Sequence, residues 1–165
     1  MKKIQLFITG GTLDKDYQTT TGELVFTQTH VDTLLNQANL TLPINIKTLM
    51  LKDSLDMTDT DRERIYQACL NSNAKYIVIT HGTDTMVETA RYLQQNNTLN
   101  TKTIVLTGAM RPFMLGNSDA SFNMASALMA AQLASNGIYL AMNGQLFNAN
   151  SVKKNRELGQ FETCI

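Results

Sequence analysis

The sequence has no tryptophan and only two cysteines and two histidines in 165 residues. Cys69 and Cys164 are far apart, and neither belongs to a CxxC or Cys/His pattern, so no zinc or iron–sulfur site is indicated. One disulfide between them is conceivable. Two free thiols fit better, because Cys69 falls on the apolar side of a predicted helix and Cys164 in a C-terminal tail, and free thiols favour a cytoplasmic location.

The sequence also lacks an excess of either charge, since fourteen basic residues balance fourteen acidic ones. No basic block is longer than Lys2-Lys3 or Lys153-Lys154, so nucleic acid and anionic membranes are not expected as partners. The apolar runs are too short to cross a bilayer. The start of the chain lacks the apolar core and cleavage site of a signal peptide, which again favours the cytoplasm.

What the sequence does contain is a series of apolar, β-branched runs separated by helical patterns. The expected strands are Ile4–Ile8, Ile46–Leu51, Tyr76–Thr80, Thr103–Thr107 and Ile138–Met142. Each run is almost continuously apolar, as in parallel strands that are covered on both faces. We therefore predict a three-layer α/β fold with a mostly parallel, flavodoxin-like sheet and helices on both faces, formed by a single domain over residues 1–165.

Four helices are predicted between these strands. One follows Thr29 and His30 over about residues 31–38, and another follows Thr58 as N-cap, with its apolar stripe at Ile65, Cys69 and Leu70. A third is capped by Asp84 or Thr85 and extends to Gln95, with Met86, Ala90 and Leu93 on one face. The fourth extends from about Ser118 to Ala134, with Phe122, Ala125, Leu128 and Leu133 expected to face inward.

Residues 12–29 are polar, lack a helical period and directly follow the first strand. A long loop in this position is often a lid or a binding loop. A plain surface connection explains the composition equally well, so both interpretations stay open.

Polar turns follow every predicted strand, and in open α/β sheets ligands bind at the carboxyl ends of the strands. The turns are Thr9–Thr12, Asp53-Ser54, His81–Thr85, Gly108–Pro112 and Asn143-Gly144. Because parallel strands bring these turns to one edge, we expect a ligand site there. No GxGxxG or GxxxxGK[ST] motif is present, so the turn with two glycines is not identified as a nucleotide-binding loop.

Threonine hydroxyls need a base or an electrostatic helper in order to act as nucleophiles. His81 is one candidate base, although a histidine in such a turn more often orients the neighbouring backbone. Asp84 paired with Lys153 or Lys154 is the better candidate, because a held lysine of lowered pKa can accept a proton. Asp84 could instead be only a helix N-cap, and the two lysines could be only a solvated pair.

With these motifs the chain resembles the N-terminal catalytic domain of the bacterial-type L-asparaginases. The resemblance is carried, in family order, by Thr9–Thr12, Asp53–Met57, His81–Met86, Thr107–Pro112 and Met142-Asn143 with Lys153 downstream. It implies an amidohydrolase without metal or organic cofactor that converts L-asparagine to L-aspartate and ammonia. Glutamine or another amide as substrate, and a catalytically silent amino-acid-binding domain, are the alternatives.

The resemblance also implies residue roles. Thr12 is the nucleophile; Thr83, Asp84 and Lys153 form the second hydroxyl–acid–base group, with Lys153 preferred to Lys154. Tyr17 corresponds by loop position to a lid tyrosine. The substrate-binding positions are Gly11, Ser54, Leu55, Gly82 and Ala109. Leu55 stands where many members have a polar residue that contacts the substrate amine.

Familiar members of the family carry a second, smaller C-terminal domain that completes the site of a neighbouring protomer. The resemblance is therefore to a short, one-domain form, in which help from another protomer comes from the same domain. A homo-oligomer is expected on this ground.

Overall fold

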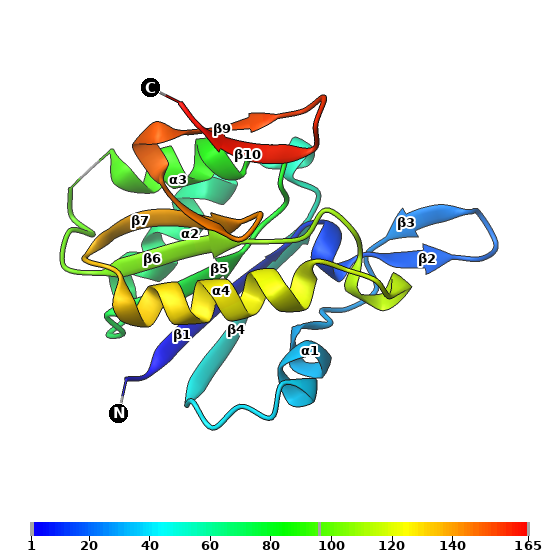
Figure 1. Ribbon diagram of the computed structural model, residues 1–165, viewed down its shortest axis with the longest axis horizontal. Coiled ribbons are helices and arrows are strands. Elements are labelled where there is room, and N and C mark those ends of the chain that lie inside the picture. Colours follow the sequence, from blue (N-terminus) through cyan, green and yellow to red (C-terminus); the bar gives the residue numbers. More distant parts are fainter. Residues whose placement is uncertain (1, 96, 165) are drawn as a thin grey trace.

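The protein is described by a computed structural model over residues 2–95 and 97–164 (Figure 1). The strands are β1 (Ile4–Gly10), β2 (Asp16–Gln18), β3 (Glu23–Val25), β4 (Ile44–Lys52), β5 (Tyr76–Thr80), β6 (Thr103–Thr107), β7 (Gly137–Met142), β8 (Gln145–Asn148), β9 (Val152–Asn155) and β10 (Gln160–Thr163). The α-helices are α1 (Val31–Gln37), α2 (Asp59–Asn71), α3 (Met86–Gln94) and α4 (Ala120–Leu133). Four 3-10 turns are η1 (Thr12–Asp14), η2 (Ser54–Asp56), η3 (Phe113–Leu115) and η4 (Ala149–Ser151).

The main sheet has six strands in the order β4-β1-β5-β6-β7-β8. Its first five strands are parallel, and β8 pairs with β7 in the antiparallel sense. All five predicted strands are present, and their order is the flavodoxin-like one, so the α/β prediction is confirmed. In this topology the crevice beside β1 and β5, where the strand order reverses, is the expected ligand position.

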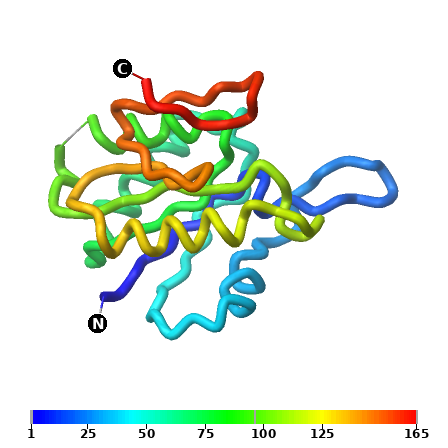
Figure 2. The backbone as a smooth tube through the Cα atoms, in the orientation of Figure 1, coloured from blue at the N-terminus to red at the C-terminus, as the bar shows by residue number. Residues whose placement is uncertain are grey.

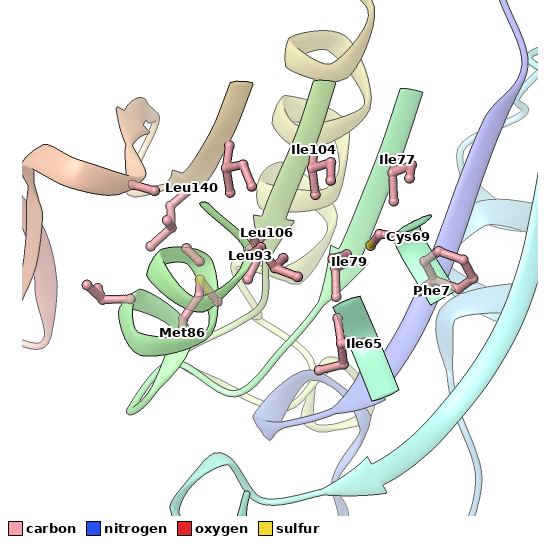
Figure 3. Close-up of a cluster of buried hydrophobic side chains, with 14 of the residues drawn as sticks. Phe7, Ile65, Cys69, Ile77, Ile79, Met86, Leu93, Ile104, Leu106 and Leu140 are labelled. Atoms are coloured by element: carbon pink, nitrogen blue, oxygen red, sulfur yellow. The ribbon is translucent and has the colours of Figure 1, made fainter. Parts of the chain in front are cut away.

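Helices cover both faces of the sheet. Successive residues of each strand point to opposite sides, so the almost continuously apolar strands present apolar side chains on both faces. On one face, α2 and α3 enclose side chains such as Phe7, Ile77, Ile79, Ile104 and Leu106 (Figure 3). On the other face, α1 and α4 pack on Ile4, Leu6, Ile8, Val78 and Val105. The two buried layers hold the carboxyl ends of the strands in fixed register, and this positions the turns.

The predicted start of α2 is confirmed in detail. The Thr58 side chain accepts a hydrogen bond from the Asp61 backbone N–H, and the Asp61 carboxylate accepts one from the Thr58 N–H, which is a capping box. Ile65 and Cys69 are buried, as predicted, but Leu70 is exposed. Cys69 and Cys164 are both free thiols. Within the described residues, no helix is both long and apolar enough to cross a membrane.

The predicted inward face of α4 is largely wrong. Leu128 is buried, but Phe122, Ala125 and Leu133 are exposed, and the helix packs instead through smaller residues. These buried residues are Ala120, Asn123, Met124, Ala127, Leu128 and Ala131. The helix has apolar residues on every side, so the periodicity of its sequence did not identify the buried face. Small side chains on the buried face allow the helix to approach the sheet closely.

The edge strand β8 was not predicted, and neither were two antiparallel hairpins outside the main sheet. β2 and β3 form one within residues 12–29, where the polar composition suggested a loop, and this hairpin projects from the body of the molecule (Figure 2). β9 and β10 form the other, beside α3 (Figure 1). Both strand pairs have only three or four residues in each strand, too few to produce a clear alternation in the sequence.

Candidate active site

The turns that follow β1 and β5 touch through glycine backbones. A Cβ atom on Gly11 would lie 2.4 Å from the Gly82 nitrogen, and one on Gly82 would lie 2.6 Å from the Ser54 Oγ atom. The Gly11 N–H donates to the Lys52 carbonyl at 2.9 Å. Three turns, from β1, β4 and β5, therefore meet with no room for a side chain at Gly11 or Gly82, as the parallel topology predicts.

Ser54 joins the β4 turn to the start of α3. Its side chain is buried, and its Oγ atom accepts a hydrogen bond from the Thr85 N–H at 3.3 Å. The Thr85 hydroxyl donates in return to the Ser54 carbonyl at 2.8 Å. Thr85, not Asp84, occupies the N-cap position of α3, so the Asp84 carboxylate remains available for other partners.

That carboxylate pairs with Lys154. The Lys154 ammonium lies 2.8 Å from Asp84 Oδ1 and donates to the Thr83 hydroxyl at 2.9 Å. The lysine side chain is only 10% exposed, so its amine is held between these two groups. A hydroxyl, a carboxylate and an amine thus meet at one corner, which is the arrangement expected of a proton-transfer group.

The preference for Lys153 at this corner is contradicted by the structure. Lys153 points outward and forms an ion pair with Glu162 at 3.2 Å, with 59% of its side chain exposed. The reason is the alternation of β9. Val152 is buried against the core, and residues two apart in a strand share a face, so Lys154 is directed toward the sheet and Lys153 away from it.

The hairpin that carries Lys154 is fixed by residues from other elements. The Arg91 guanidinium of α3 donates to the Val152 carbonyl at 3.0 Å. The Asn143 side chain, which follows β7, accepts from the Phe161 N–H at 2.8 Å. The Asn143-Gly144 turn thus positions the hairpin that supplies the lysine, a role that its sequence did not indicate.

Arg156 is a residue of this corner that sequence reasoning missed. Its guanidinium donates to the Asp84 carbonyl at 3.1 Å and lies 3.5 Å from Asp84 Oδ1. Two cations therefore face one carboxylate, which favours an anionic group in the remaining space. No motif marks Arg156, since only the hairpin brings it near Asp84.

The ring nitrogens of His81 contact neither Thr12 nor Thr83 and have other partners. His81 is fully buried, and burial lowers its pKa to about 4, so the ring is neutral near pH 7. One ring nitrogen lies 2.7 Å from the Gly82 carbonyl and the other 2.7 Å from the Thr89 hydroxyl. The imidazole therefore holds the backbone of the Gly82 turn in place.

The remaining predicted site residues differ in their burial and in the element that carries them. Thr12 is half-buried at the start of η1, directly after Gly11, and Ala109 is buried after β6. Leu55 is 65% exposed beside buried Ser54. Tyr17 lies on β2 with 53% of its surface exposed, and its hydroxyl is near Gly22 within the same hairpin. The structure thus gathers Gly11, Gly82 and Ser54 and leaves Tyr17 on the projecting hairpin.

The close contact of the two turns makes a prediction for Gly11→Ala. Because the new Cβ would collide with backbone and φ is +81°, we expect the free energy of unfolding to fall by at least about 3 kcal/mol, as measured by denaturant titration. Gly22→Ala is the matched control. Its φ is +74° but its nearest neighbour is 3.8 Å away, so a loss of only about 1 kcal/mol is expected. Equal losses would contradict the contact.

Among residues 2–95 and 97–164, no three His, Cys, Asp or Glu side chains lie close enough together to hold a metal ion. The polar groups at the Asp84 corner are the Thr83 hydroxyl, the Asp84 carboxylate, the Lys154 amine and the Arg156 guanidinium, with the backbone N–H groups of the neighbouring turns. This set suits addition to a carbonyl carbon followed by departure of an amine.

Comparison with known proteins gives a consistent result. Residues 3–161 match the family model described as "Asparaginase, N-terminal". A protein of Haemophilus influenzae named "Probable L-asparaginase periplasmic" is 32% identical over 93% of this chain, and a component of the glutamyl-tRNA(Gln) amidotransferase of Methanococcus vannielii is 34% identical over 88%. The chain spans 46% and 35% of these relatives.

A solved structure described as a probable cytoplasmic L-asparaginase from Campylobacter jejuni superposes with a TM-score of 0.85 and 27% identity. The match covers 99% of this chain and 53% of that one. The similarity therefore includes all the turns described above.

Proposed function

The chain belongs to the asparaginase family, and we propose that it hydrolyses L-asparagine to L-aspartate and ammonia. The observation that carries the proposal is the contact of the Lys154 amine with both the Thr83 hydroxyl and the Asp84 carboxylate. This corner is adjacent to Gly82, whose backbone abuts the Gly11 turn that precedes Thr12.

In the proposed reaction, the Thr12 hydroxyl oxygen adds to the side-chain amide carbon of the substrate. Backbone N–H groups of the Gly11 and Thr83 turns stabilise the oxyanion that forms. The departing nitrogen takes up the proton that the Thr12 hydroxyl has lost and leaves as ammonia near the Ala109 carbonyl. Water then adds to the aspartyl ester, the Thr12 oxygen regains a proton, and aspartate is released.

Lys154 is the proposed base of this sequence. It lies 2.9 Å from the Thr83 hydroxyl, through which a proton can reach it. Asp84 keeps the amine in position, and Ser54 with Asp84 holds the charged groups of the substrate. Tyr17 would act as a lid residue if the β2–β3 hairpin closes toward the turns.

The decisive experiment measures ammonia release from L-asparagine and from L-glutamine at steady state. We expect asparagine to give the higher kcat/KM. Calorimetric binding of asparagine without turnover would instead indicate a silent binding domain and overturn the proposal.

Hydrolysis of a different amide is the second candidate. One relative is named as part of an amidotransferase, and two side chains of this chain lie beside residues expected to bind the substrate. Leu55 presents an exposed apolar side chain, and Arg156 adds a positive charge beside Asp84. Glutamine is one methylene longer than asparagine, and one methylene changes binding by only about 1–3 kcal/mol. A higher kcat/KM for glutamine in the same assay would favour this candidate.

We also propose that copies of the chain associate through α4. The helix contains no charged residue, and it exposes Phe122, Met129 and Leu133 by 64%, 54% and 74%. An uncharged apolar face of this kind is typical of a contact surface. The two free thiols agree with the proposed cytoplasmic location.

The association can be tested with Met129→Glu. A carboxylate in the centre of the exposed face should convert the wild-type oligomer to a monomer in light scattering after size exclusion. Thr60→Glu, an exposed position on the opposite layer, should leave the mass unchanged. A monomeric wild type would contradict the proposal.

A further inference from the structure

A groove of about 1100 Å³ lies at the other end of the sheet from the candidate active site. It is formed by the early part of β1, by β4, by α2 and by the segment 72–75 that precedes β5. These parts of the fold lie near the N-terminus, whereas the β2–β3 hairpin and the turns lie at the opposite end of the main sheet (Figure 1). The groove therefore shares no residue with the turns.

Five cationic side chains line this groove. They come from four separate segments and are Lys2, Lys3, Lys47, Arg64 and Lys75. No aspartate or glutamate is among the described residues that line it, although the whole chain has equal numbers of acids and bases. The fold thus concentrates positive charge that the sequence distributes over 74 positions.

These cations are not neutralised by neighbours. Within the described part of the chain, none of the five forms an ion pair with a carboxylate. Lys2 and Lys75 instead lie 5.2 and 5.8 Å from the centre of the Tyr76 ring. The Lys2 ammonium also donates to the Gln132 carbonyl at the end of α4, so Lys2 and Lys75 contribute charge at the edge of the groove.

The floor of the groove is polar at a position where a parallel strand is usually apolar. Gln5 is only 8% exposed, between Ile4 and Leu6, which are fully buried on the opposite face. The Asn45 side-chain amide donates to Gln5 Oε1 at 2.7 Å, and Gln5 Nε2 donates to the Asn45 carbonyl at 3.0 Å. The amide side chains Gln67, Asn71 and Asn73 line the groove as well. The lining of the groove is therefore polar as well as charged.

We propose that this groove binds a small molecule with two or more phosphate groups. A single carboxylate would use one cation, whereas five cations in one hollow match several negative charges. The volume of about 1100 Å³ is slightly larger than the about 300–1,000 Å³ of typical small-molecule sites, so a nucleoside triphosphate or an inorganic polyphosphate fits.

The test is isothermal titration calorimetry with ATP and with inorganic tripolyphosphate at physiological salt. Both should bind, because the phosphates carry the recognition. Lys47→Gln and Arg64→Gln should each weaken binding about tenfold, the effect of losing one charge-assisted hydrogen bond. Lys52→Gln is the matched control, since this lysine lies on the same strand but pairs with Asp61 at 2.7 Å, and its binding should match wild type.

Thermal unfolding identifies any variant that is misfolded. If either Lys47→Gln or Arg64→Gln is misfolded, the other variant decides the test. The proposal is overturned if neither phosphate compound binds, or if both groove variants bind like wild type. It is also overturned if a single-stranded RNA oligonucleotide binds more tightly than ATP and is weakened by the same variants. Amide hydrolysis should be unchanged in Lys47→Gln and Arg64→Gln, so this test is independent of the proposed function.

Discussion

Replacing Lys154 by methionine should lower kcat for ammonia release by about 100- to 10,000-fold, the range expected for loss of a general base. Methionine keeps much of the length and apolar stem of the side chain but removes the amine that contacts Thr83 and Asp84. The structure should survive, because Arg156 still lies beside Asp84. The measurement is steady-state ammonia release, with thermal unfolding as the check on folding.

The neighbouring lysine provides the control. Lys153→Met removes an exposed ion pair with Glu162, which contributes at most about 1 kcal/mol to stability, and kcat should stay within about twofold of wild type. Lys154→Arg separates two roles of the amine, because an arginine keeps the charge but does not release its proton near neutral pH. Full activity in Lys154→Arg would show that only the charge is needed. Loss of activity in Lys153→Met but not in Lys154→Met would reverse the assignment.

Replacing Thr12 by alanine should lower ammonia release by at least about 1,000-fold, since removal of a nucleophile leaves only binding and oxyanion stabilisation. The side chain is half-buried at the start of η1, so the loss of one hydroxyl should change the free energy of unfolding little. Thr12→Ser keeps a hydroxyl and should retain measurable turnover.

Thr83→Val should also abolish ammonia release while the fold is maintained.

Mass spectrometry of the quenched reaction tests the same step directly. A protein that forms the proposed ester should gain the mass of an aspartyl group, and Thr12→Ala should not. Full activity in Thr12→Ala would rule out this residue as the nucleophile. An aspartyl adduct that persists in Thr12→Ala would place the ester on another residue.

The sequence predicted the central sheet well because its strands are long apolar runs with polar turns at their carboxyl ends. It also predicted that the turns of Gly11, Ser54 and Gly82 would meet, since this follows from parallel pairing alone. The N-cap at Thr58 was predictable because its capping box depends on residues three apart.

The sequence failed where long-range placement decides the outcome. Lys153 and Lys154 are adjacent, and the choice between them depends on which face of β9 contacts the core. Buried Val152 two positions before Lys154 was the signal that could have shown this. No pattern in the sequence indicated that Phe122 is exposed on α4 or that Arg156 approaches Asp84. Both features depend on how whole elements pack.

The Lys154 hairpin has a consequence for the order of synthesis. The amine at the Thr83 corner lies about seventy positions later in the chain than that corner, and its hairpin is held by the Phe161 N–H. A nascent chain can therefore pair β1, β4, β5, β6 and β7 while the lysine is still inside the ribosome. Under the proposed mechanism, the early strands then present Thr12 and Thr83 without the Lys154 amine, so a growing chain would gain activity only after the β9–β10 hairpin has emerged.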